Sequence, residues 1–296
     1  LPRTLVWNSA WDAARDGETP ARQYVELILA NVAAETDSSV ILVQLRQLAT
    51  TLNFYVAEEH RESTAIAAVD RLWDLASEVP AGSDAQLQFV KSFALLARSA
   101  SQLDRVAGLL DGSVVLEGLG IDQDLRWELV ASLVAGGRMA QDGIDAELQR
   151  DNTSSGQNAA ALAKAAIPTP EAKAAAWESI VVKGELSNAL QGSAVAGFMR
   201  VLDRSLLEPY SEKYFAAVPG IVATRTHALA QQIVVGLYPA LLTTQATIDR
   251  TDAFLASLPA ESAALRRMML ENRDGVARAL RARSADVLPG ESAPAA

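Results

Sequence analysis

Apolar residues recur along most of the chain at the spacing of one helix face, and this periodicity is what most constrains the fold. Tyr24, Leu27, Ile28 and Val32 form one such stripe, since residues three and four apart lie on the same side of a helix. No segment sustains the alternation of apolar and polar residues that a half-buried strand requires. The sequence therefore predicts an all-α protein, with residues 112–121 as the one place for a short extended piece.

Capping residues mark where several predicted helices begin. Thr19-Pro20 and Thr169-Pro170 each place a threonine before a proline, which is typical of an N-cap followed by the first helical residue. Ser83 and Gln86 have the spacing of a capping box. Together with the glycines and prolines between apolar stretches, these positions predict roughly fifteen helices joined by short turns.

Helices in series with short loops favour antiparallel pairs stacked into a curved α-solenoid with a concave face. The chain shows no fixed repeat period and no tetratricopeptide, ankyrin or leucine-rich signature, which favours an irregular array of the HEAT or armadillo type. No internal linker is evident, so residues 1–287 are expected to form a single helical-repeat domain. Residues 288–296, rich in Pro, Ala and Gly, are expected to be a disordered tail.

Charge and composition exclude several function classes. The net charge of -10 and a pI of about 4.8 argue against nucleic acid as a partner, because phosphate binding needs a basic stripe. The chain has no cysteine, which excludes disulfides and thiolate metal sites.

No apolar run reaches the roughly 18 residues of a membrane span, and the N-terminus lacks the apolar region of a signal peptide. We expect a cytoplasmic protein with no membrane partner. Because no methionine precedes Leu1, we also expect it to be part of a longer polypeptide.

Motifs that carry chemistry are missing from the sequence. The two histidines, His60 and His227, lie far apart in the chain, and no H-E-x-x-H helix occurs. His60 lies in the charged run Glu58–Glu62, which is typical of a solvated helix end, so no metal site is predicted. Neither a phosphate-binding P-loop nor a G-x-S-x-G nucleophile turn is present. We predict that the chain has no catalytic residues of its own.

Several segments, in the same order along the chain, resemble the C-terminal helical domain of bacterial M1-family zinc aminopeptidases. These segments are Leu5-Val6-Trp7, Trp11-Asp12-Ala13-Ala14-Arg15-Asp16-Gly17-Glu18, Asp124-Leu125-Arg126-Trp127, Asp151-Asn152-Thr153-Ser154-Ser155-Gly156-Gln157, Ala172-Lys173-Ala174-Ala175-Ala176-Trp177, residues 210–225, Tyr238-Pro239 and residues 265–283. They span nearly the whole chain, although none is a catalytic signature.

The resemblance implies a non-catalytic domain that caps the active site of a peptidase. In that family a helical bowl closes over a zinc-containing catalytic domain and forms the wall of a cavity through which peptides reach it. The zinc, its ligands and the general base would all lie upstream, and the parent enzyme would remove N-terminal amino acids from peptides. The implied partners are the upstream catalytic domain and the peptide substrates.

Two arginines are candidates for the cavity wall. Arg126 lies among residues that look buried, where it either meets a peptide carboxylate or forms an internal ion pair, with Asp151 as a candidate partner. Arg225, at a predicted helix start, has the same two interpretations. Near the beginning of the chain, Trp7, Trp11, Arg15 and Glu18 are candidates for an interface with the upstream domain. The tryptophans are also typical of core positions, and the charged turn is also typical of a solvated one.

Two other interpretations remain open. A free-standing helical scaffold that binds a protein on its concave face would share the fold. An all-α enzyme with a carboxylate site would require a buried cluster of acids facing a pocket.

Overall fold

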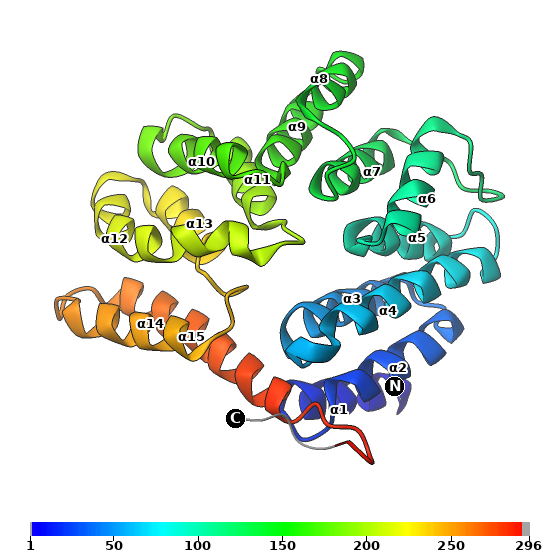
Figure 1. Ribbon diagram of the computed structural model, residues 1–296, viewed down its shortest axis with the longest axis horizontal. Coiled ribbons are helices and arrows are strands. Elements are labelled where there is room, and N and C mark those ends of the chain that lie inside the picture. Colours follow the sequence, from blue (N-terminus) through cyan, green and yellow to red (C-terminus); the bar gives the residue numbers. More distant parts are fainter. Residues whose placement is uncertain (1, 292–296) are drawn as a thin grey trace. The chain divides into compact units, whose positions relative to one another are not determined.

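The structure, a computed structural model, describes residues 2–291, and within that range it contains helices and no strand (Figure 1). Fifteen α-helices and four short 3-10 or π segments lie in the described part of the chain. The all-α prediction is confirmed. The stretch 112–121, where an extended piece was expected, consists of turns and irregular backbone.

The chain divides into two compact units. The first comprises the residues up to Asp122 together with those from Ala277 onward, and the second is Gln123–Val276. The boundary within the last helix, α15 (Ala263–Ser284), carries no break in the helical pattern. The boundary between the two units therefore leaves no linker in the sequence.

The first unit is built from six helices and the end of α15. They are α1 (Pro2–Asp16), α2 (Ala21–Asn31), α3 (Ser38–Thr50), α4 (Glu58–Glu78), α5 (Asp84–Leu96) and α6 (Ala100–Asp111), with the 3-10 turn η1 (Val32–Ala34) and the π segment η2 (Thr51–Tyr55). Helix α5 packs against α3 and α4. Leu72, Phe89 and Phe93 are fully buried and belong to the apolar core of this unit.

The second unit contains α7 to α14 and the beginning of α15. Its elements are α7 (Gln123–Ala135), α8 (Gln141–Arg150), α9 (Ser154–Ala166), α10 (Pro170–Trp177), α11 (Asn188–Met199), α12 (Glu208–Thr224), α13 (His227–Gly236) and α14 (Gln245–Ser257), with the π segment η3 (Glu178–Lys183) and the 3-10 turn η4 (Arg204–Leu207). Tyr214 and Tyr238 are buried in this unit with ring centroids 5.9 Å apart.

Helix α9 is the central element of the second unit, because it packs against α7, α8, α10 and α11. Its contact with α11 is close: a Cβ added to Gly197 of α11 would lie 2.0 Å from the Leu162 carbonyl oxygen of α9. A side chain at position 197 would therefore force the two helices apart. The alanines of α9, several of which are buried, allow the same close approach.

Two of the three predicted helix caps are present, and the third is not. The Thr169 side chain accepts a hydrogen bond from the Ala172 backbone N–H, with Pro170 at the first helical position, as predicted. Ser83 likewise accepts from the Gln86 N–H. At Thr19-Pro20 the prediction is wrong, because α2 begins at Ala21, Pro20 has extended backbone angles, and no neighbouring side chain caps the helix. The described helices include none long and apolar enough to cross a membrane.

Candidate functional site

Arg126, a candidate for the cavity wall, is held in a two-point ion pair. Its Nε donates to Glu147 Oε1 at 2.9 Å and its Nη2 to Glu147 Oε2 at 2.7 Å. Arg126 projects from α7 and Glu147 from α8, and their side chains are 20% and 6% exposed. The hydrogen bonds from Arg126 lower the pKa of the Glu147 carboxyl. The internal pair foreseen for Arg126 is therefore present.

Asp151, the candidate partner for Arg126, has contacts of its own. Asp151 instead accepts hydrogen bonds from Trp127 Nε1 at 2.8 Å and from the Thr153 hydroxyl at 2.7 Å. These bonds lower the pKa of the Asp151 carboxyl. The Arg126–Glu147 and Trp127–Asp151 contacts both start from α7. They join it to α8 and to the residue that follows α8, and so fix the position of the helix that carries Arg126.

Arg225, the second candidate, follows α12 and is half-buried. Its Nη2 donates to the Val181 carbonyl oxygen of η3 at 2.9 Å. Gly184, which has a φ of +64°, leaves the space for this side chain, because a Cβ there would lie 1.1 Å from Arg225 Nη1. Arg126 and Arg225 therefore have separate contacts, one on α8 and one on η3.

The four interface candidates at the start of the chain differ in how far they reach the surface. Trp7 is buried, and its Nε1 donates to Glu35 Oε1 at 2.9 Å. Trp11 is half-buried against Tyr24 and Tyr55, with ring centroids 5.7 and 5.8 Å away. The other two candidates are charged. Arg15 Nη2 lies 3.1 Å from Asp12 Oδ1, and Glu18 is exposed.

The exposed apolar side chains of α1 are Leu5 and Val6, which are 61% and 60% exposed. They precede Trp7 in the sequence and lie on the side of the helix that faces solvent. The most exposed apolar side chains of α1 are therefore aliphatic, whereas Trp7 is buried and Trp11 is half-buried.

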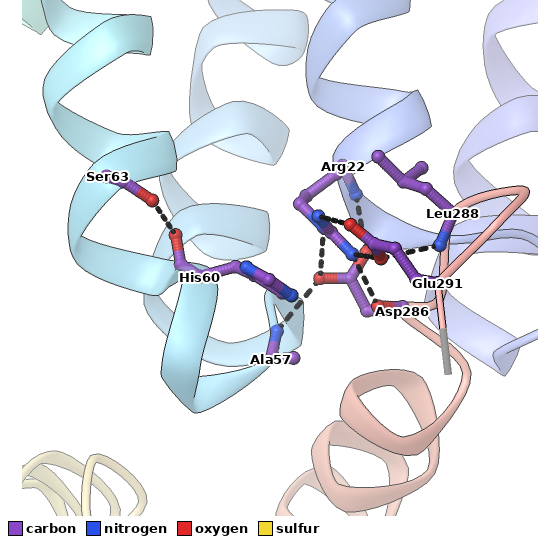
Figure 2. Close-up of polar contacts among 7 residues, drawn as sticks. All are labelled: Arg22, Ala57, His60, Ser63, Asp286, Leu288 and Glu291. Atoms are coloured by element: carbon purple, nitrogen blue, oxygen red, sulfur yellow. Dashed lines mark hydrogen bonds and ion pairs between the residues drawn. The ribbon is translucent and has the colours of Figure 1, made fainter. Parts of the chain in front are cut away.

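A polar network that the sequence did not predict lies around Asp286 in the first unit (Figure 2). Its buried carboxylate accepts from the Arg22 and Ala57 backbone N–H groups, both at 2.9 Å, and from Arg22 Nε at 3.2 Å. Arg22 lies in the first turn of α2 and Ala57 immediately precedes α4. One carboxylate thus caps the starts of two helices, where the helix dipole favours negative charge.

The same arginine also holds the end of the described chain. Arg22 forms a two-point ion pair with Glu291, with one of its contacts at 2.8 Å, and the Leu288 N–H donates to the same carboxylate at 2.9 Å. These bonds hold the pKa of the Glu291 carboxyl at about 2. His60 extends toward this network (Figure 2). Residues 288–291, expected in the disordered tail, are held here, and 292–296 lie outside the described residues.

Lys173 is the buried cation of the second unit and was also missed. Its ammonium donates to the carbonyl oxygens of Ala165 at 2.7 Å, Phe198 at 2.9 Å and Gly197 at 3.4 Å. These carbonyls belong to the C-terminal ends of α9 and α11, where the helix dipole favours positive charge. Burial lowers the pKa of the Lys173 ammonium to about 7.

None of these arrangements is a catalytic centre. Arg126–Glu147, Arg22–Asp286 and Lys173 are ion pairs or helix caps whose hydrogen bonds run to other parts of the same unit. Among residues 2–291, no group of three or more His, Asp or Glu side chains is placed to hold a metal ion. The geometry defines a helical domain in which charged side chains join neighbouring helices.

Comparison with known proteins places this helical domain in a family. Residues 1–278 match the family described as the ERAP1-like C-terminal domain, and the chain belongs to that family. It is 45% identical over 291 residues to aminopeptidase N of Streptomyces lividans. The alignment covers 98% of this chain and 34% of that protein, so the chain spans about a third of the length of its relative.

Proposed function

We propose that this chain is the non-catalytic C-terminal domain of a zinc-dependent M1 aminopeptidase that removes N-terminal amino acids from peptides. The observation that carries the proposal is the family match over residues 1–278, supported by the 45% identity to an aminopeptidase N. The sequence contains no H-E-x-x-H, so zinc and its ligands belong, on this proposal, to an upstream catalytic domain.

The domain's role in this proposal is to cap the active site and to form the wall of the peptide-access cavity. A curved array of helices presents a concave surface, and an enclosed cavity admits short peptides while it excludes folded proteins. Arg126 and Arg225 are the proposed wall residues. Because both are engaged with Glu147 and Val181 respectively, each would meet a substrate as an already oriented group, which lowers the entropic cost of binding.

We assign the contact with the catalytic domain to α1. Leu5 and Val6 offer exposed aliphatic surface, and interdomain surfaces bury such groups. Arg15 and Glu18 would lie at the polar border of this surface. Trp7 and Trp11 would support it from within the first unit, since they are buried and half-buried there.

The test is to express the upstream catalytic portion with and without this chain. Turnover is measured with a dipeptide analogue and with the N-terminus of a folded protein. If the chain is a cap, its presence lowers turnover of the folded protein relative to the dipeptide analogue. Identical behaviour in both preparations would exclude a capping role and favour a free-standing interaction scaffold. The chain by itself is expected to show no turnover and no stoichiometric zinc.

A further inference from the structure

A pocket of about 360 Å³ lies in the second unit among α8, α9, α10, η3 and α11. Its walls are formed largely by small side chains, among them Ala165, Ala172, Ala176 and Ala194, with Ile167 and Leu186 as the larger apolar members. The volume is at the low end of the roughly 300–1,000 Å³ typical of ligand pockets. The pocket therefore suits a compact aliphatic group.

The three helices that form most of the pocket wall are connected by one buried side chain, Lys173. Lys173 belongs to α10, and its ammonium binds the C-terminal carbonyls of α9 and of α11. Those three helices supply most of the lining. One buried side chain thus connects three walls, so the pocket is already formed before any ligand arrives, which is the usual state of small-molecule sites.

One lining residue carries charge. Lys164 Nζ lies 2.9 Å from Asp145 Oδ1, and both side chains are half-exposed. Gln141, which also lines the pocket, donates to the two Asp145 oxygens at 3.0 and 3.1 Å. An ammonium has three N–H donors and a carboxylate about four acceptor positions. The pair therefore has donors and acceptors left for a ligand that carries both charges.

We propose that this pocket binds a free aliphatic α-amino acid, with its side chain among the alanines, its carboxylate on Lys164 and its ammonium on Asp145. The ligand's side chain and carboxylate match the apolar volume and the cation of the lining. Its ammonium matches the Asp145 carboxylate, which contacts two lining residues, Lys164 and Gln141. Such amino acids are also what the proposed parent enzyme would release. The inference depends on the proposed function only for the source of the ligand, because binding is measured on this chain alone.

The experiment titrates the 296-residue chain with L-leucine and follows binding by saturation-transfer NMR and calorimetry. Three analogues test the three features: isoamylamine lacks the carboxylate, 4-methylpentanoate lacks the ammonium, and glycine lacks the side chain. We expect saturable binding of leucine with a millimolar or tighter dissociation constant, and at least roughly tenfold weaker binding of each analogue. Absence of saturable leucine binding, or equal binding of 4-methylpentanoate, would overturn the proposal.

Two variants locate the site. Ala176→Leu fills the pocket, and Lys164→Met removes its cation while retaining the aliphatic stem; each should weaken leucine binding by at least roughly tenfold. The matched controls are Ala174→Leu, exposed on the same helix and outside the pocket lining, and Lys183→Met, an exposed lysine of η3. Both controls should bind leucine as the parent chain does. Circular dichroism establishes the folding of each variant. Because the Lys164 side chain is half-exposed, Lys164→Met is expected to fold, so the site can be tested even if Ala176→Leu does not fold. Unchanged leucine binding by Lys164→Met would contradict the assignment.

Discussion

Asp286 in the first unit and Lys173 in the second are buried charges at helix ends, and they differ in how their charge is compensated. Asp286 accepts hydrogen bonds at the starts of α2 and α4, and Lys173 donates to carbonyls at the ends of α9 and α11. Each sign of charge therefore lies where the helix dipole favours it. Asp286 additionally contacts the guanidinium of Arg22, whereas the hydrogen-bond partners described for Lys173 are backbone carbonyls.

Helix ends supply hydrogen bonds to Lys173, but its burial still disfavours the charged form. Burial alone is the cause that lowers the pKa of the Lys173 ammonium to about 7, because desolvation disfavours the charged form. The Asp286 carboxylate forms an ion pair with Arg22 at 3.2 Å. We therefore expect the second unit to be the more sensitive to pH near neutrality, and the first to depend more on the integrity of a single ion pair.

The largest effect is expected for Asp286→Ala. This change leaves the Arg22 and Ala57 N–H groups without their acceptor and the poorly exposed Arg22 side chain without its buried partner. Breaking a buried pair from one side costs about 3–5 kcal/mol. Urea unfolding followed by circular dichroism measures the loss in the free energy of unfolding.

A matched control separates this network from ordinary helix capping. Asp37 accepts from the Ser39 N–H at 2.8 Å at the exposed start of α3, in the same unit. Asp37→Ala should cost only about 1 kcal/mol. Equal losses in the two variants would show that Asp286 acts as a simple cap.

The next effect concerns Lys173→Met, which removes the hydrogen bonds from Lys173 to the ends of α9 and α11 and is expected to cost about 1–3 kcal/mol at pH 9. The cost should be smaller at pH 6. Below about pH 7 the lysine is protonated both folded and unfolded. Between about pH 7 and its ordinary value of 10.5, the unfolded chain retains a proton that the folded chain has lost. Stability of the parent chain therefore rises with pH across this window, while methionine contributes no such slope.

Unfolding measured at several values between pH 6 and 10 tests this dependence. The control is Lys213→Met, at an exposed position over the ring of Tyr210, which should change the free energy of unfolding by less than about 0.5 kcal/mol. A constant difference between the parent chain and Lys173→Met across the window would mean that the carbonyls keep Lys173 charged when folded.

A smaller loss is expected for Glu147→Gln, because its partner Arg126 is one-fifth exposed. We expect about 1–2 kcal/mol at neutral pH, toward the low end for hydrogen bonds to a charged group. Arg126 lowers the pKa of Glu147, so the pair's contribution is fully present above the ordinary glutamate pKa and is lost as the pH falls through the folded value. Acid unfolding curves should therefore converge for the parent chain and the variant at low pH.

The two Thr-Pro pairs show how far local sequence predicts this fold. Thr169-Pro170 caps α10 as expected, because the required donor is the Ala172 N–H three residues away. Thr19-Pro20 does not cap α2, since the acceptor for the Arg22 N–H is Asp286, which is 264 residues distant. Helical periodicity and local caps thus predict the elements, whereas a partner on a distant segment overrides the local pattern where one is available.

The candidate residues follow the same rule. An internal ion pair for Arg126 follows from a charge among apolar neighbours, but the choice of Glu147 over Asp151 depends on how α7 and α8 each pack against α9. The Arg22 network and the Lys173 contacts join segments that no periodicity relates. The composition of residues 288–296 predicts a disordered tail, but it does not show that Glu291 has the guanidinium of Arg22 within reach.

The smallest effect is expected for Glu291→Gln, which tests whether the second carboxylate on Arg22 matters beside Asp286. Glu291 is partly exposed and lies near the end of the described chain, so solvent and salt screen its pairing with Arg22. The bonds from Arg22 and the Leu288 N–H hold its pKa at about 2, below the ordinary glutamate value. Its contribution is therefore constant above about pH 4.5 and is lost as the pH falls toward 2. We expect a slight decrease in the unfolding midpoint at low salt and none at high salt, together with faster hydrogen exchange at the Leu288 amide. A loss as large as that of Asp286→Ala would show that the end of the chain, and not the buried carboxylate, holds α2 and α4 in place.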